Sequence, residues 1–474
     1  MVRDIYPIDH IYLIIIKIMK SKYYFSILCI HFILLCCAQS KEININKFNV
    51  NGNDKADDIQ NFDKAIEYIS QNGGVLYIPK GDYYLDNKRR SRKGVYNNSY
   101  IFLISTSFKI RMDKEAVLHY QNDFKGFRFR TTQDPTEKTI NKYEVEIEGG
   151  IVEGSKNNVT KVKDNPNIWA FVGETLKKFQ VSNMTVKNLY GSAGVTSFSN
   201  DLAVISNNVF QNVTGNPNDY IDNHGNGIYI GETKAYEVDN NKIINTVEES
   251  KRLGTVGICI EGGAGNGKIS NNFVSGYDRG IHVELISGTS NIIKNQLIGN
   301  SSGVVLWNNN GYKQIVESNI INNRGLIKST KPILYTAAPI LLLGYNANSG
   351  TVINNNTITI EKDFFIPNHI MQITSDKVSV TNNIFLDNSR TLSLSISQGE
   401  GDKKRVNGIV FSGNKVVGAN IYVYDGSNIN ISNNRFDINE AVISFDTSRN
   451  IYKNNTFPKG KSPKRIQMFG KYTN

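Results

Sequence analysis

An asparagine-rich pattern recurs along most of the chain and restricts the fold more than any other feature. It reads apolar, any residue, Asn or similar, Asn or other, any residue, apolar. Copies begin at Val181, Ile205, Val238, Ile269, Ile293, Val316, Ile353, Val380, Phe411, Ile431 and Tyr452. The shortest spacings between successive copies are 20–24 residues, and the longer ones are typical of the same unit with inserted loops. Self-similarity at such a period indicates a solenoid.

The residues within each unit predict strands. Apolar residues alternate with a period of two, and Val, Ile and Phe are enriched. Leucine-rich repeats share the period but require a ladder of Leu, which this sequence lacks. Three short strands per coil predict an all-β fold, a right-handed parallel β-helix. The paired asparagines then fit tight corners in left-handed backbone geometry, where stacked side chains can hydrogen-bond along the axis.

Residues 48–85 carry a second signature, which predicts a capping helix over about 57–70. Asp57 or Asp58 can cap the helix at its N-terminus. One apolar stripe at helical spacing follows, made by Ile59, Phe62, Ile66 and Ile69. Gly73 and Gly74 end the helix, and a strand and a turn follow. An amphipathic helix suits this place because a solenoid needs a cover over its open apolar end.

This cap resembles that of the pectate-lyase-3 and family-28-glycosidase-related group within the pectin-lyase-like superfamily. Its usual form is GDG-x-x-DD followed by GG-x-V-x-x-P-x-G-x-Y, and here Asn53 and Asp54 replace the usual Asp-Gly. With the coils behind it, the resemblance covers about residues 45–457. It implies a β-helix that acts on or binds carbohydrate. It leaves the reaction open, because the superfamily includes lyases, hydrolases, epimerases and phage tail proteins.

The N-terminus predicts export. Lys20 and Lys22 precede an apolar run from Tyr23 to Cys37, and Ala38-Gln39-Ser40 supplies small residues for cleavage. We expect a signal peptide over 1–40, with Met19 as an alternative start of translation, and a single β-helix domain over 41–474. A lipoprotein anchor at Cys36 or Cys37 is the alternative. No later apolar run is long enough to span a membrane, so we expect a periplasmic or secreted protein.

The net charge of the chain limits the chemical classes of partner that it is expected to bind. The sequence has a net charge of +11, and removing residues 1–40 leaves about +9 and one cysteine, Cys259. An exported basic protein favours an acidic glycan over nucleic acid as its partner, and we expect a monomer. Two basic runs add to this expectation, Lys88, Arg89, Arg90, Arg92 and Lys93, and then Lys125, Arg128 and Arg130.

Four coils contain a second strand that can be aligned, over residues 227–231, 257–261, 280–284 and 303–307. Because the alternate residues of each strand must enter the core, the others are expected to face solvent. The two outward columns are Tyr229, Cys259, His282 and Val305, and Gly231, Glu261, Glu284 and Trp307. Neighbouring coils stack about 4.8 Å apart. Glu261 and Glu284 should therefore be close neighbours, with His282 beside them. We expect Cys259 to be a small residue that fills space on the sheet.

Elimination at a uronic acid is our first hypothesis for this patch, by a chain-cleaving lyase or a terminal dehydratase. The chemistry needs a cation for the sugar carboxylate, a base and an acid. Arg279, Arg252 or Lys251 would hold the carboxylate, while His282 or His224 would be the base. Tyr229 would donate a proton, and Trp307 would stack on a sugar. Glu261 and Glu284 could also hold a Ca²⁺ ion that bridges to the substrate; no other cofactor is expected.

Two further hypotheses remain open. Glu261 and Glu284 could instead hydrolyse a glycosidic bond, and their expected separation suits a retaining pair. The signature motifs of the family-28 hydrolases are missing from the corresponding strands, which disfavours a polygalacturonase. The third hypothesis is a solenoid that binds glycans without catalysis. The Asn-, Lys- and Ile-rich composition is similar to that of proteins that degrade sulfated, uronate-containing algal glycans such as ulvan.

Overall fold

The computed structural model describes most of the chain after residue 40. The described residues are 41–86, 100–121, 124–132, 141–154, 168–215, 225–247, 254–323, 338–344, 347–361, 369–389, 393–396, 406–437, 441–445 and 451–458. They belong almost entirely to one compact unit that begins at Ile43. The predicted signal peptide over 1–40 lies outside the described residues and stays a prediction.

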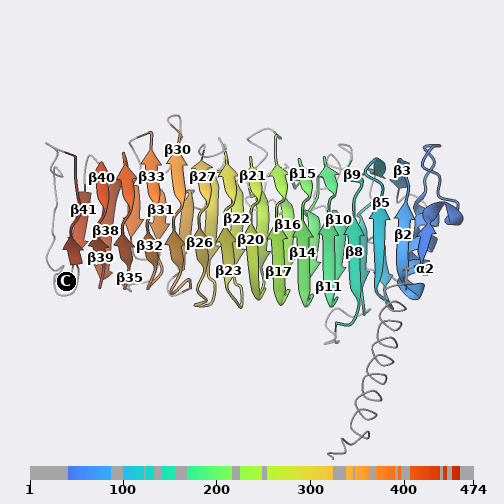
Figure 1. Cartoon of the computed structure of the whole chain (residues 1–474), viewed down its shortest axis with the longest axis horizontal. Coiled ribbons are helices and arrows are strands. Elements are labelled where there is room, and N and C mark those ends of the chain that lie inside the picture. Colours follow the sequence, from blue (N-terminus) through green and yellow to red (C-terminus); the bar gives the residue numbers. More distant parts are fainter. Residues whose placement is uncertain are drawn as a thin grey trace, which may run out of the picture. The chain divides into compact units, whose positions relative to one another are not determined.

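The unit is a right-handed parallel β-helix, as the repeat predicts. Its described strands form three parallel sheets of 15, 14 and 13 strands, which we name A, C and B. Sheet A runs to β42 (Ile451–Lys453) and includes β2 (Gly74–Ile78), and sheet B runs from β3 (Gly81–Asp86) to β40 (Arg435–Asp437). Successive strands of the chain enter different sheets, so that each coil stacks on the one before it (Figure 1).

Sheet C carries the strands that were aligned from the sequence. In stacking order it contains β4 (Tyr100–Leu103), β7 (Phe127–Arg130), β10 (Trp169–Glu174), β13 (Ala193–Phe198), β16 (Asn226–Gly231), β19 (Val256–Glu261), β22 (Arg279–Glu284), β25 (Ser302–Trp307), β28 (Ile340–Leu343), β31 (His369–Ile373), β34 (Ser393–Ile396), β38 (Asn420–Ser427) and β35 (Val406–Asn407), with β41 (Ala441–Phe445) also paired to β38. The stretch before residue 150, where the repeat is faint, supplies the early coils through β4 and β7.

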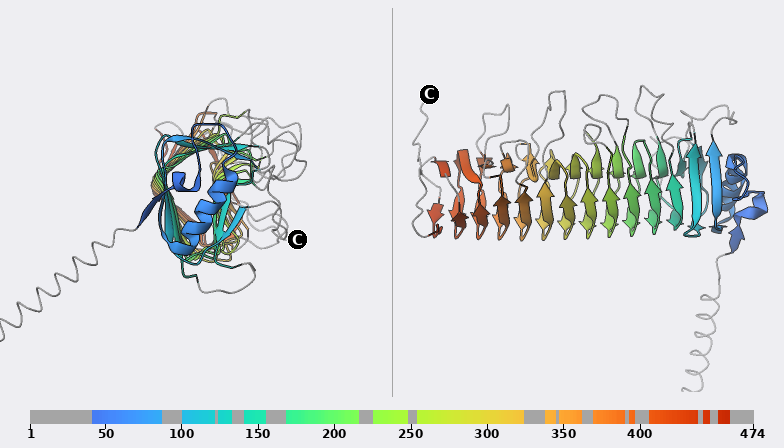
Figure 2. Two further views of the ribbon diagram at one scale, coloured as in Figure 1. Left: turned by 90° about the vertical axis from the view of Figure 1, so that its right-hand side faces the viewer. Right: turned by 90° about the horizontal axis from the view of Figure 1, so that it is seen from above.

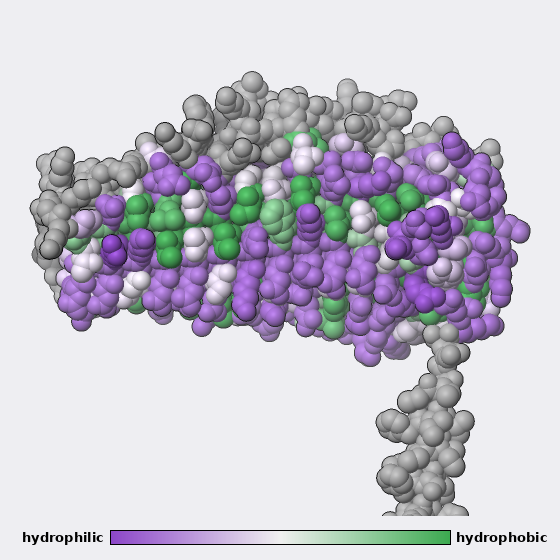
Figure 3. Space-filling model, turned by 45° about the horizontal axis from the view of Figure 1, so that its top comes forward, coloured by the Kyte–Doolittle hydropathy of each residue, from purple (hydrophilic) through white to green (hydrophobic). Residues whose placement is uncertain are grey.

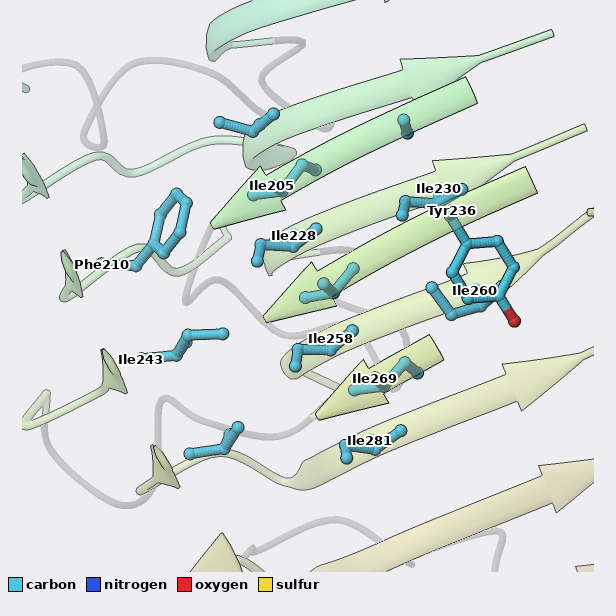
Figure 4. Close-up of a cluster of buried hydrophobic side chains, with 14 of the residues drawn as sticks. Ile205, Phe210, Ile228, Ile230, Tyr236, Ile243, Ile258, Ile260, Ile269 and Ile281 are labelled. Carbon is cyan, nitrogen blue, oxygen red and sulfur yellow. The ribbon is translucent and has the colours of Figure 1, made fainter. Parts of the chain in front are cut away.

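The core is a stack of aliphatic side chains from all three sheets. Ile228, Ile258 and Ile281 occupy the same register position on β16, β19 and β22, and each is fully buried. Figure 4 shows these residues one above another, with Ile269 and Tyr236 of sheet A facing them. Because every coil covers the apolar face of its neighbour, burial of these columns stabilises the whole solenoid.

The two asparagines of each pair have different structural roles. The first of the pair adopts the left-handed backbone conformation, with φ of 59° at Asn207 and 55° at Asn271. The second is buried and hydrogen-bonds its counterpart on the next coil. This ladder joins Asn208, Asn241, Asn272, Asn295, Asn319, Asn356, Asn383, Asn414, Asn434 and Asn455. The predicted structural role of the asparagines is thereby confirmed.

The predicted cap is helix α2 (Ile59–Asn72), which lies across the N-terminal end of the coils (Figure 2). Its buried stripe is the predicted one, and it ends at Gly73 with φ of 72°. The capping contacts differ from simple expectation. Asp57 accepts the N–H of Ile59 at 3.1 Å, whereas Asp58, at the N-cap position, accepts the N–H of Asn51 at 3.0 Å and leaves Oδ2 without a partner.

Replacing Asp58 by Asn should remove a pH-dependent loss of folding free energy that arises at the cap. Asp58 is 4% exposed, and burial raises its pKa from 3.8 to about 6. A carboxyl whose pKa is higher in the folded state stabilises the fold at low pH, and this contribution is lost between about pH 4 and 6. We expect the D58N variant to avoid a loss of about 3 kcal/mol in unfolding free energy across that window. Urea unfolding at pH 4 and 7 measures it, and equal pH slopes for wild type and variant would contradict it.

The outer surface is mostly hydrophilic. Figure 3 shows hydrophobic side chains gathered in a band that runs along the coils beside a hydrophilic face. Ile320 and Ile384 are the most exposed large aliphatic residues on the described part of sheet B, at 49% and 37%. No helix among the described residues combines the length and the apolar composition needed to cross a bilayer.

Candidate active site

The outward face of sheet C brings the predicted site residues together. Tyr229 pairs in register with Cys259, Cys259 with His282, and His282 with Val305. The second column follows the same alignment, since Gly231 pairs with Glu261 and Glu284 with Trp307. The register expected from the sequence is therefore the observed one, although the catalytic roles of these residues stay predictions.

Glu261, His282 and Glu284 form one tight cluster. One ligand-forming atom from each of the three side chains lies within 4.8 Å of the others. The Nε2 atom of His282 is 2.8 Å from a carboxylate oxygen of Glu284. The cluster therefore has the composition of an acid–base site.

The surroundings of His282 keep its ring neutral. Burial lowers its pKa below the ordinary value, and the nearby Arg279 guanidinium lowers it further. Arg279 has only donors, and its NH1 atom lies 3.4 Å from Nδ1, so Nδ1 is the acceptor in this contact. The ring proton then resides on Nε2 and is donated to Glu284. His282 is thus the donor in its hydrogen bond to Glu284.

Glu261 has different partners from Glu284. The Tyr229 hydroxyl and the Cys259 thiol both hydrogen-bond to it. Burial, with the Glu261 charge next in effect, raises the pKa of Tyr229 far above its usual range, so the phenol remains protonated. Burial likewise raises the pKa of the Cys259 thiol. Glu261 is therefore held by two neutral donors.

One expectation about this face was wrong. The column of Cys259, His282 and Val305 was expected to face solvent, yet these side chains are 4%, 1% and 3% exposed. Residues in one column are a coil spacing apart and pack on one another, and His282 also meets the Trp307 ring edge-on at 6.3 Å. Trp307 itself packs against a second apolar cluster with Val305 and Leu341, while it retains some exposure.

A cleft of about 340 Å³ adjoins the cluster on its N-terminal side. The cleft runs over five strands of sheet C and is lined by Arg128, Trp169, Val172, Glu174, Ser192, Ala193, Thr196, Phe198, Asn226, Tyr229 and Glu261. Sequence reasoning assigned neither Trp169 nor Glu174 to a site. The buried Glu174 carboxylate pairs with both Arg128 and Arg130, so part of the positive charge of this basic run is neutralised within the protein.

Several predicted residues cannot be placed. His224, Lys251 and Arg252, predicted to bind substrate, lie outside the described residues, as does the basic run from Lys88 to Lys93. Arg279, predicted to be catalytic, is partly buried and approaches His282.

The cluster could also hold a metal ion. Calcium prefers six to eight oxygen ligands, whereas the donors offered here are a histidine nitrogen and two carboxylates. That mixed set fits a transition metal such as Zn²⁺ or Mn²⁺ better than the predicted Ca²⁺. The direct hydrogen bond from His282 to Glu284 satisfies both groups without an ion.

Comparisons with known proteins agree with the fold class. No protein-family model matches the chain. An iota-carrageenase of Zobellia galactanivorans is 28% identical over 153 residues, which are 31% of this chain and 27% of that enzyme. The tailspike protein of E. coli bacteriophage HK620, solved in complex with a pentasaccharide, superposes with a TM-score of 0.59 at 14% identity, over 88% of this chain and 78% of the tailspike. A mutant of the same tailspike gives a TM-score of 0.60.

Proposed function

We propose that the chain is a glycoside hydrolase of an acidic glycan and that Glu261 and Glu284 are its catalytic carboxyl groups. The observation that carries the proposal is the close approach of these two carboxylates, within 4.8 Å, at the edge of a cleft. The partial match to iota-carrageenase, a hydrolase of a sulfated algal galactan, supports hydrolysis and an anionic substrate. The basic sequence fits the same class of substrate.

The partners of the two carboxyl groups suggest different roles. Glu284 accepts the hydrogen bond from His282 Nε2, which holds its carboxylate in place, and we propose it as the nucleophile. Glu261 lines the cleft, where a leaving-group oxygen would sit, and we propose it as the general acid. A separation of about 5 Å is typical of retaining enzymes, so we propose retention of anomeric configuration.

The geometry gives elimination at a uronic acid less support. That reaction needs a free base, and both ring nitrogens of His282 are engaged, one by Glu284 and one by Arg279. The other predicted base, His224, lies outside the described residues. Burial raises the pKa of Tyr229, the predicted proton donor, which leaves its phenol a weak acid at neutral pH. His282 is therefore proposed as a positioning residue rather than the base of a lyase.

A panel of acidic and neutral glycans tests the proposal. Wild-type protein should release new reducing ends from a sulfated or uronate-containing glycan, without the ultraviolet absorbance of an unsaturated uronate. Absorbance with chain cleavage would establish a lyase, and absorbance with loss of one water and no shortening a dehydratase. Binding without either product would leave a glycan-binding solenoid.

Chelation should leave the activity intact. The direct contact between His282 and Glu284 completes the proposed site without an ion. We expect hydrolysis after exhaustive treatment with EDTA to proceed at the untreated rate. Loss of activity that Zn²⁺ or Mn²⁺ restores would show instead that Glu261, His282 and Glu284 bind a metal ion, and Ca²⁺ added alone serves as the comparison.

A further inference from the structure

The cleft beside the carboxylates has the layout of an extended binding site. In register, Glu174 lies three strands before Glu261, through Phe198 and Gly231. Trp169 opens the same strand as Glu174 and is aligned with Val256, at the other end of the strand that carries Glu261. Three coil spacings are about 14 Å, so the cleft is long enough for more than one sugar ring. Its volume falls within the usual range for ligand sites. A chain bound between Trp169 and Glu261 would run obliquely across the strands of sheet C.

The far end of this cleft carries an arginine beside an aromatic ring. Arg128 and Arg130 both pair with one carboxylate, that of Glu174. The guanidinium of Arg128 also lies 5.9 Å from the centre of the Trp169 ring. Trp169 retains exposed surface, so an aromatic face and the Arg128 guanidinium stand side by side at the cleft wall.

Two polar atoms of the cleft wall have no hydrogen-bond partner among the described residues. The buried Nε–H of Arg128 donates to none of them, and the buried Oγ1 of Thr196 neither donates to nor accepts from any of them. Thr196 is 8% exposed, and both residues line the cleft. An unpaired buried donor costs free energy. Arg128 and Thr196 share one register position, on either side of Val172, so an oxyanion of a ligand bound between them would be an acceptor for both groups.

We propose that this end of the cleft is a subsite for an anionic sugar, which stacks on Trp169 while its sulfate or carboxylate binds Arg128 and Thr196. The subsite rests on the proposed hydrolase function and extends it. It orients the glycan along sheet C, with an anionic unit at Arg128 and the bond to be cleaved at Glu261 and Glu284. The groups that bind the anionic sugar then lie at a different place in the cleft from the carboxyl groups that cleave the glycan.

Isothermal titration calorimetry with size-defined oligosaccharides tests the subsite. The probes are a sulfated galactan oligosaccharide, its desulfated form, and an oligogalacturonate, so that sulfate and carboxylate are separated. Arg128→Gln should weaken binding of the anionic ligands about tenfold or more and leave the desulfated ligand unaffected. Trp169→Ala should weaken all bound ligands by a similar factor. Arg128→Lys, which keeps the charge and loses the planar fork, should recover part of the affinity.

Controls separate this subsite from general effects. Arg435→Gln removes an exposed arginine on β40 of sheet B and should change no dissociation constant. Thermal unfolding of each variant identifies any that fail to fold, and Thr196→Val provides a second probe that leaves the Arg128–Glu174 pair in place. If wild type cleaves an acidic glycan but R128Q and T196V bind it as tightly as wild type, the subsite is wrong and the hydrolase proposal stands. If no glycan is bound or cleaved, both fail.

Discussion

Glu284→Gln should abolish most of the glycan-cleaving activity while the fold is preserved. The substitution keeps an oxygen to accept the His282 Nε2 proton but removes the negative charge that the proposed nucleophile needs. We expect a fall in kcat of about a thousandfold or more. Initial rates of reducing-end release on the best substrate of the panel measure it. The melting temperature should stay close to that of wild type.

The companion variants assign the two carboxyl groups. Glu261→Gln should also lower kcat strongly, and less so for a substrate with an activated leaving group, because such a group needs no acid. Glu284→Ala with added azide should form a glycosyl azide if Glu284 is the nucleophile. Glu237→Gln, which alters an exposed glutamate on β17 (Ala235–Asp239) of sheet A, should be fully active. Unchanged activity in both E261Q and E284Q would dismiss the pair.

Asn295→Ala should be the most destabilising single substitution among the corner residues. Asn295 is fully buried and donates to the Ile269 carbonyl at 2.9 Å and to Asn319 at 3.0 Å. It also accepts from the backbone N–H and the side chain of Asn272, each at 3.0 Å. Its removal leaves several buried polar groups unpaired, and we expect a loss of about 4 kcal/mol. The midpoint of denaturant unfolding, followed by circular dichroism, measures the effect.

A control at the first position of an Asn pair, taken on another coil, separates the effect of the buried ladder from the effect of the turn. Asn382 is exposed and left-handed, with φ of 56°. On the next coil Gly413 fills the same corner, with φ of 69°. Asn382→Gly should therefore change stability by less than about 1 kcal/mol. Similar losses for N295A and N382G would contradict the division of labour between the two asparagines of each pair.

The sequence predicted the coils well because one local pattern repeats in each of them. The αL corner and the buried ladder both follow from the Asn pair, and the aligned Gly-Ile-x-Ile strands set Cys259 opposite His282. Alternation reveals which side chains leave the core. It does not reveal what packs outside, so the burial of His282 was missed.

The cleft was beyond the reach of the same reasoning. Its far wall is built by Arg128 on β7 and by Trp169 and Glu174 on β10, where the repeat is too faint to fix the register. Glu174 is separated from Arg130 by 44 residues, and no local signal links them. A clue was available in composition, because the chain has two tryptophans and both, Trp169 and Trp307, lie on sheet C.

Mass spectrometry of the products formed in water enriched in heavy oxygen tests the central claim most directly. Hydrolysis by Glu261 and Glu284 predicts that every newly formed reducing end carries one heavy oxygen atom and that no product is unsaturated. The E284Q variant should give no such product. Unlabelled fragments that are lighter by one water would contradict the account, because they would show that the chain cleaves its glycan by elimination.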